Sequence, residues 1–141
     1  MQVRPMAKPK SQTAKQIEAI LPFLNAFERM GFRCGEWPVE SETSVIPHFE
    51  HSDPVETFVQ ALHDNGWIET FYWTKWQAEA AKYVDSPNLL ASADVGTIRK
   101  LLTTHVRKDR LCKGHLASMF ENGHIVALLQ RLKGIRAEMK S

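Results

Sequence analysis

The chain has 141 residues, of which 43% are hydrophobic and 24% are charged, and its formal net charge is +2. These values fit one globular domain that buries its own core, and they exclude a disordered chain. The sequence has no run of about 18 apolar residues that could cross a bilayer and no apolar N-terminal signal. Its two cysteines, Cys34 and Cys112, form no CxxC pair, so we expect free thiols and a cytoplasmic location.

The small net charge conceals a strong sorting of charge along the sequence. Residues 1–17 carry four basic and no acidic side chains, residues 18–94 carry four basic and thirteen acidic ones, and residues 95–141 carry ten basic and three acidic ones. The basic C-terminal third must meet negative charge, either on a partner or on the acidic middle segment of the same chain. The sequence leaves both alternatives open.

The N-terminal region is predicted to be an arm followed by a bent helix. Residues 1–12 combine two prolines with basic side chains and have no apolar periodicity, so we expect a flexible basic arm. Apolar residues then recur at helical spacing from about 14 to 30. Pro22 lies inside this stretch and should bend the helix or divide it, because proline removes one backbone hydrogen bond.

A short β-hairpin and a second helix are predicted next. Glycines and prolines between residues 32 and 49 leave room only for brief extended segments, so we expect at most a short hairpin there. Asp53 has the position of a cap before the proline at the first helical position. Asn65 and Gly66 end this helix.

The C-terminal half reads as four further helices. Apolar stripes and capping residues place them at about 74–85, 94–109, 114–122 and 124–133, with Gly134 as the C-cap of the last one. No internal repeat and no glycine-rich phosphate loop is present. The sequence therefore predicts an all-α fold, a compact bundle of five to six helices in which residues 13–141 form a single domain.

The densest group of polar side chains lies on the helix predicted at 94–109 and just after it. Five residues would share nearly one face and are called the basic face here: Arg99, Thr103, Arg107, Arg110 and His115. Guanidinium groups and a hydroxyl suit phosphate or carboxylate oxygens, so this face predicts a site for an anionic ligand or a nucleic-acid backbone. The alternative, and the more common role of such arginines, is ion pairing with carboxylates of the acidic middle segment such as Glu56, Asp64, Glu69 or Glu79.

Six of the thirteen aromatic residues lie within seventeen positions: Trp67, Phe71, Tyr72, Trp73, Trp76 and Tyr83. Stacked bases or a flat ligand could use such a surface. However, Trp73, Trp76, Ala80 and Tyr83 have the spacing of a core-facing helical stripe, and neighbouring carboxylates would repel phosphate. We therefore interpret the rings as core, with Trp67 and Tyr72 outside the stripe.

Histidines provide two weaker candidates. His48 and His51 lie with two carboxylates within six residues, a set that Zn²⁺ accepts, although the spacing matches no known helix-borne metal motif. His115 and His124 lie near predicted helix N-termini, where the helix dipole favours a neutral imidazole that could act as a base. We predict a hydrogen-bonded structural role for His115 and His124, and no cofactor for the protein.

Several blocks of the sequence together form a distinctive pattern: Gly66-Trp67, Trp73, Trp76, Leu102-Thr103, Arg107, Arg110, Gly114-His115 and Gly123-His124. This pattern resembles a bacterial family of domains of unknown function, and the resemblance covers about residues 54–133. Leu111 departs from it, because many relatives are expected to carry an aromatic residue there. The resemblance implies a bacterial, phage or plasmid setting and a small stand-alone protein, and it transfers no activity, cofactor or substrate.

The sequence alone does not identify the function, and three hypotheses follow from it. The preferred one is a small non-enzymatic module that binds an anionic ligand or nucleic acid on the basic face. The second is a protein-interaction or homodimerisation module whose charges pair internally. The third is an enzyme that uses His115 and His124, or a metal held by His48 and His51. No membrane partner is expected.

Overall fold

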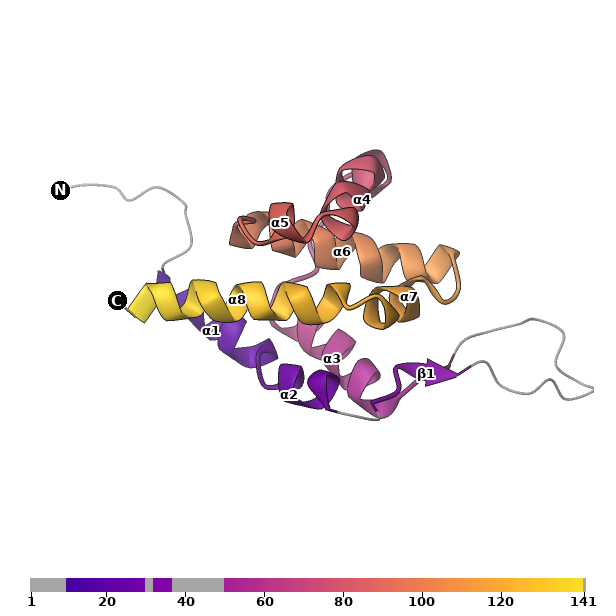
Figure 1. The fold of residues 1–141 in the computed structure, drawn as a ribbon, viewed down its shortest axis with the longest axis horizontal. Coiled ribbons are helices and arrows are strands. Elements are labelled where there is room, and N and C mark those ends of the chain that lie inside the picture. Colours follow the sequence, from indigo (N-terminus) through magenta and orange to yellow (C-terminus); the bar gives the residue numbers. More distant parts are fainter. Residues whose placement is uncertain (1–9, 30–31, 37–49, 141) are drawn as a thin grey trace, which may run out of the picture.

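Eight α-helices, one 3-10 helix and two short strands make up the part of the chain that the structure describes, residues 10–29, 32–36 and 50–140 (Figure 1). The structure is a computed structural model. The elements are α1 (Lys10–Ile20), α2 (Phe23–Glu28), β1 (Gly35–Glu36), β2 (Glu50–His51), α3 (Asp53–Asp64), the 3-10 helix η1 (Trp73–Trp76), α4 (Gln77–Asp85), α5 (Pro87–Leu90), α6 (Val95–Leu111), α7 (His115–Glu121) and α8 (His124–Lys140). The predicted all-α fold class is therefore confirmed.

The first predicted helix is divided into α1 and α2 at Leu21 and Pro22. Pro22 has no N–H, so the regular helical ladder cannot continue through it. The N–H of Leu24 instead donates to the carbonyl of Leu21 at 2.9 Å, which starts α2 in a new direction. The division of this helix, together with the separate short helix α5, explains why the structure has more helices than the sequence predicted.

The start of α1 bears on the predicted basic arm. α1 begins at Lys10, so the last residues assigned to the arm, 10–12, are helical. Residues 1–9 lie outside the described residues. The division into an arm and a single domain stays a prediction.

The predicted hairpin is present as an antiparallel pair of two-residue strands. Gly35 pairs with His51 and Glu36 pairs with Glu50. The second strand lies just beyond the predicted limit of residue 49, and residues 37–49 are outside the described part of the chain. This pair places His51 beside α6, where it reaches the candidate site described below.

Caps and glycines set the helix ends, mostly as predicted. Asp94 accepts a 2.8 Å hydrogen bond from the N–H of Thr97 and caps α6. Gly66 ends α3 with a φ of +75°, which a glycine adopts without steric cost. The prediction for Asp53 was wrong by one position, because Ser52 holds the N-cap and Asp53 is the first residue of α3.

The last helix is longer than predicted. α8 runs from His124 to Lys140, so Gly134 lies inside the helix and is not a C-cap. The apolar stripe continues past this glycine, and Ile135 and Met139 pack against the core. Their burial outweighs the poor helix propensity of one glycine, which costs about 1 kcal/mol relative to alanine.

The core surrounds α8. In Figure 1, α8 runs along the middle of the molecule, with α1, α2 and α3 on one side and α4, α5 and α6 on the other. No helix among the described residues has the length and apolar content needed to cross a membrane. The largest fully buried side chains are Trp67, Phe58, Ile17, Ile20, Leu62, Ile98, Leu101, Leu102, Ile125, Leu128, Leu129 and Leu132.

The aromatic residues divide between core and surface. Trp67, which lay outside the predicted stripe, is fully buried, and its Nε1–H donates to the carbonyl of Gln16 at 3.0 Å. Trp76 and Tyr83 stack on each other with ring centroids 6.2 Å apart and pack partly against the core, as the stripe predicted. Tyr72 is 79% exposed.

Candidate functional site

The five residues of the predicted basic face do not form one site in the structure. Arg99 is held by contacts within the fold. The Arg99 guanidinium carbon lies 5.0 Å from the centroid of the Trp67 ring, and its Nη2 donates to Oε1 of Gln16 at 3.0 Å. Gln16 in turn donates from Nε2 to the carbonyl of Asn65 at 2.9 Å. Arg99 therefore joins α6 to α1 and to the end of α3, and its guanidinium serves the fold.

Thr103 is also committed to the fold. Its side chain is fully buried, and its hydroxyl oxygen lies 3.1 Å from the carbonyl oxygen of Trp67 and 2.9 Å from that of Arg99. The same oxygen accepts a 3.1 Å hydrogen bond from the N–H of Glu69. Its hydroxyl hydrogen and one of its two lone pairs are used inside the protein, and because the side chain is fully buried it is not open to a ligand.

Arg107 and Arg110 are the cations of this face that remain open. Arg107 is half-buried and Arg110 is exposed. Neither makes a hydrogen bond or ion pair with another residue in the described part of the chain. Of the carboxylates expected to pair with the arginines, Glu79 pairs with Lys82 at 2.7 Å.

The acidic middle segment and the basic C-terminal third do meet, at other residues. Nη2 of Arg136 lies 3.0 Å from Oε1 of Glu18, and Nε2 of His51 lies 2.9 Å from Oδ2 of Asp109. In the first pair Glu18 is exposed and Arg136 is half-buried, so the pair contributes little to stability. The second joins β2 to α6 and is more protected.

The predicted metal candidates are not brought together. His48 lies outside the described residues, and His51 is engaged by Asp109. Within the ranges that the structure describes, no group of three or more histidines, cysteines or carboxylates is arranged to hold a metal ion.

The structure instead brings three histidines together where α6, α7 and α8 meet. We call His105, His115 and His124 the histidine cluster. Nδ1 of His105 lies 3.0 Å from Nε2 of His115, within hydrogen-bonding distance, so one of these nitrogens carries the shared proton. The ring of His124 meets the ring of His105 edge to face, with centroids 4.9 Å apart. His105 and His124 are 2% and 4% exposed, and His115 is half-buried.

All three imidazoles have pKa values below the ordinary value of 6.5. Burial lowers the pKa of His105 well below that value, and the charges of His124, His115 and Lys108 lower it further. Burial and Lys108 lower the pKa of His115, while Asp109 opposes this change. Burial, assisted by His115, lowers the pKa of His124 to about 4. The whole cluster is therefore neutral at pH 7.

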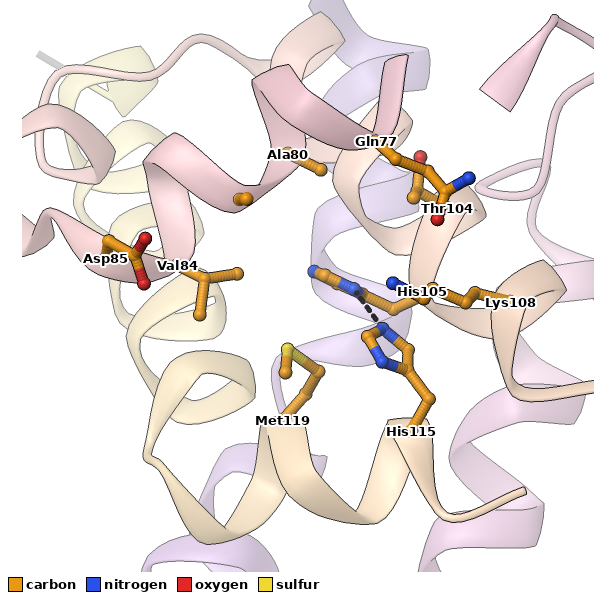
Figure 2. Close-up of a pocket in the computed structure, with 10 residues that line it drawn as sticks. Gln77, Ala80, Val84, Asp85, Thr104, His105, Lys108, His115 and Met119 are labelled. Atoms are coloured by element: carbon orange, nitrogen blue, oxygen red, sulfur yellow. Dashed lines mark hydrogen bonds between the residues drawn. The ribbon is translucent and has the colours of Figure 1, made fainter. Parts of the chain in front are cut away.

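A cavity of about 140 Å³ opens beside this cluster, between α4, α6 and α7 (Figure 2). Ala80, Ala81, Val84 and Met119 form its apolar wall. Its polar lining consists of Gln77, Asp85, Thr104, His105, Lys108 and His115. Polar groups set into an otherwise apolar small cavity are typical of ligand sites.

Buried polar atoms without partners lie at this cavity and behind it. Nε2 of His105 and Oγ1 of Thr104 expose almost no surface and make no hydrogen bond within the described residues. In Figure 2 the free end of the His105 ring points toward the space between Val84 and Met119. Nε2 of His124, on the other side of His105, also lacks a partner there. Because an unpaired buried polar group costs about 1–3 kcal/mol, a ligand or water in the cavity that bonded to Nε2 of His105 or Oγ1 of Thr104 would be favoured.

Sequence reasoning identified two members of the cluster and missed the third. His115 was placed on the basic face, and both His115 and His124 were considered as bases, but a structural role was preferred for both. His105 lies three residues after Leu102 and seven after Ile98, which places an imidazole in the buried stripe of α6. That spacing was the available signal, because a titratable ring in an apolar stripe needs a partner that another helix must supply.

Comparison with known families adds one finding. The model of a family of unknown function, DUF6508, matches residues 12–138. The chain belongs to this family. No curated protein and no solved structure matches the chain. The resemblance to an uncharacterised family is thus confirmed, and the function of this DUF6508 domain has to be argued from its own geometry.

Proposed function

We propose that this DUF6508 domain is a binding module that holds a small anion in the cavity between α4, α6 and α7. The observation that carries the proposal is the pair of buried, unpartnered polar atoms at this cavity, Nε2 of His105 and Oγ1 of Thr104. The anionic ligand predicted from the sequence is kept, but its site moves from the basic face to the next face of α6. His115 belongs both to the basic face and to the lining of this cavity.

The charge at the polar end of the cavity favours an anion. Thr104 and Lys108 are four residues apart on α6 and therefore lie on the same side of the helix. Lys108 is close enough to lower the pKa of both His105 and His115, whereas Asp85 has no such influence on either ring. A carboxylate that accepts hydrogen bonds from Thr104 and Lys108 would satisfy an orphaned hydroxyl and place opposite charges together.

The size of the cavity limits the ligand. A volume of about 140 Å³ is close to the roughly 150 Å³ of an engineered apolar cavity that binds benzene. The ligand is thus a molecule of a few non-hydrogen atoms, with its polar group toward Lys108 and its apolar part against Ala80, Val84 and Met119. Isobutyrate has this shape and provides a suitable probe.

Titration of ¹⁵N-labelled protein with isobutyrate, followed by amide chemical shifts, tests the proposal. Isobutyrate should shift amides of α4, α6 and α7, and isobutyramide, which has the same shape without the charge, should not. Lys108→Met should weaken isobutyrate binding by about ten- to a hundredfold, because a charge-assisted hydrogen bond contributes about 1.5–3 kcal/mol. Lys113→Met, at an exposed lysine outside the cavity, is the matched control. Equal responses to both compounds would contradict an anion site.

Nucleic-acid binding is the second candidate, favoured by the free cations of α6. Arg110 and Lys113 are exposed, and Arg107 has no partner among the described residues. Fluorescence anisotropy with labelled DNA and RNA at low and physiological salt tests it. Binding that falls steeply with salt and disappears in Arg107→Ala/Arg110→Ala would support this candidate. No binding at low salt would direct attention to a protein partner for exposed Tyr72.

A further inference from the structure

The two hydrogen-bonded histidines have the arrangement of a proton relay. Nδ1 of His105 and Nε2 of His115 are 3.0 Å apart, which leaves Nε2 of His105 and Nδ1 of His115 as the outer nitrogens of the pair. Nε2 of His105 is buried and unpartnered at the cavity. Figure 2 shows both outer nitrogens on the side of the rings that faces Met119 and Val84. Both residues line the cavity.

A neutral pair of this kind has two tautomers of the same charge. In one, His105 carries its proton on Nδ1 and donates it to Nε2 of His115, so that Nε2 of His105 accepts and Nδ1 of His115 donates. In the other tautomer every role is reversed. Taking up a proton at one outer nitrogen and releasing another at the opposite outer nitrogen converts one tautomer into the other. No net charge is created inside the protein, where charge would be costly.

We propose that the His105–His115 pair catalyses proton transfer within a small enolisable anion, of the 2-oxo acid class, held in this cavity. The proposal rests on the proposed anion site. Thr104 and Lys108 hold the carboxylate, so the carbonyl and its neighbouring carbon face the two rings. A 2-oxo acid supplies the carboxylate, an acidic C–H and a carbonyl oxygen that takes a proton, all within the size of the cavity.

The step balances without a cofactor. The C–H bond next to the carbonyl breaks, its proton goes to Nε2 of His105, and its electron pair becomes the carbon–carbon double bond of the enol. The proton on Nδ1 of His105 passes to Nε2 of His115. The proton on Nδ1 of His115 goes to the carbonyl oxygen, which completes the enol. Return to the ketone inside the cavity reverses each transfer and restores the same C–H bond. An enol that leaves the cavity becomes the ketone in solvent and takes its C–H proton there. The pair then returns to its first tautomer by taking a proton from solvent at half-buried His115 and releasing one from Nε2 of His105 into the open cavity.

The surroundings of the pair keep this relay neutral. Lys108 on the same helix and His124 on α8 disfavour a positive charge on His105, and burial does so most strongly. Asp109 acts in the opposite direction on His115 but is already engaged by His51 and by the N–H of Leu116. Asp85 on α4 lies at the cavity wall. The relay should therefore work at neutral pH and fail in acid, where either ring becomes protonated.

Pyruvate in D₂O tests the activity, because each enol that becomes the ketone in solvent takes a deuteron in place of the lost methyl proton and reduces the methyl signal in the ¹H NMR spectrum. The wild-type protein should accelerate this loss by about a hundredfold over free imidazole at equal concentration, the lower range of general acid–base catalysis. His115→Gln keeps a hydrogen-bonding side chain beside His105 but cannot pass a proton, so it should lose the acceleration. Its pyruvate-induced amide shifts should remain. His63→Gln, at an exposed histidine, is the matched control.

The outcomes separate this proposal from the anion site. Pyruvate that binds without faster exchange would overturn the relay and leave the anion site intact. Exchange that survives His115→Gln would show a single base and also overturn the relay. If neither pyruvate nor isobutyrate binds to the wild-type protein, both proposals fail. If His115→Gln does not fold, the absence of acceleration in the wild-type protein would still overturn the relay.

Discussion

The backbone N–H of Leu116 donates a 2.9 Å hydrogen bond to Oδ1 of Asp109, seven residues earlier in the chain. Leu116 lies in the first turn of α7, and its N-cap residue, Gly114, has no side chain and a φ of +85°. Asp109 therefore caps α7 from the preceding helix. Its other oxygen, Oδ2, lies 2.9 Å from Nε2 of His51. One carboxylate thus fixes the orientation of α7, and with it the position of His115 against His105.

Asp109→Ala should destabilise the fold and weaken the hydrogen bond between the rings of His105 and His115. Loss of an N-cap costs about 1–2 kcal/mol, and the uncapped first turn of α7 carries His115. Urea unfolding measures the stability, and the tautomer-sensitive ¹⁵N shifts of His105 and His115 report the contact between the rings. Asp64→Ala is the control, because Asp64 makes only an exposed hydrogen bond with Gln60. A stability loss as small as that of the control would show that Asp109 is not a cap.

Two adjacent buried threonines provide a matched pair. Thr103 and Thr104 are 0% and 2% exposed, but only Thr103 has hydrogen-bond partners within the described residues. Thr103→Val leaves the N–H of Glu69 without its partner and should cost about 1–3 kcal/mol of unfolding free energy. Thr104→Val removes an orphaned hydroxyl and should be neutral or slightly stabilising.

The same two threonine variants distinguish an effect on stability from an effect on ligand binding. Thr104→Val should weaken isobutyrate binding and leave the unfolding free energy unchanged. Thr103→Val should lower the unfolding free energy and leave isobutyrate binding to the folded protein unchanged. Chemical denaturation and the amide-shift titration measure the two effects on the same samples. Equal destabilisation by both substitutions would mean that Thr104 has a structural partner and that its hydroxyl is no evidence for a ligand.

Gly134 tests the revised end of α8, and Gly66 at the end of α3 provides the contrast. An added Cβ at Gly134 meets no atom within 4 Å, and this residue is helical, so Gly134→Ala should stabilise the protein by up to about 1 kcal/mol. Gly66 has a φ of +75°, and a Cβ there would lie 3.0 Å from Nε2 of Gln16, so Gly66→Ala should destabilise. Thermal melts compare the two. Destabilisation by Gly134→Ala would restore the C-cap that the sequence predicted.

The fold was more predictable than the site, for a physical reason. Apolar periodicity and caps such as Asp94 and Gly66 act within a few residues, so the sequence shows them directly. The histidine pair depends on how α6 and α7 pack, and no local pattern reports that His105 and His115 share a proton. Thr103 and Arg107 have the spacing on α6 that a ligand-binding face would need, but the complete burial of Thr103 and the partial exposure of Arg107 follow from tertiary contacts alone.

The histidine cluster should make stability fall as the pH is lowered. An unfolded histidine has a pKa near 6.5, and all three cluster histidines have lower values in the folded protein. Below pH 6.5 the unfolded chain binds protons that the folded protein does not, so acid favours unfolding. The stability is fully present above pH 6.5. For His124 it is lost between pH 6.5 and about 4, a shift equivalent to roughly 3 kcal/mol.

His124→Phe isolates this contribution. Phenylalanine keeps a flat ring against His105 but cannot titrate, so the variant should lose less stability than the wild type between pH 6.5 and 4. Urea unfolding at several pH values measures the difference, and His63→Gln should leave the wild-type dependence unchanged. Asp109 does not affect this pH range: burial raises its pKa, but the hydrogen bonds from His51 and Leu116 outweigh burial and hold the pKa below 3.8, so its stabilising contribution is lost only below that pH. An unaltered pH dependence in His124→Phe would mean that His124 is already protonated, or free to become so, in the folded protein.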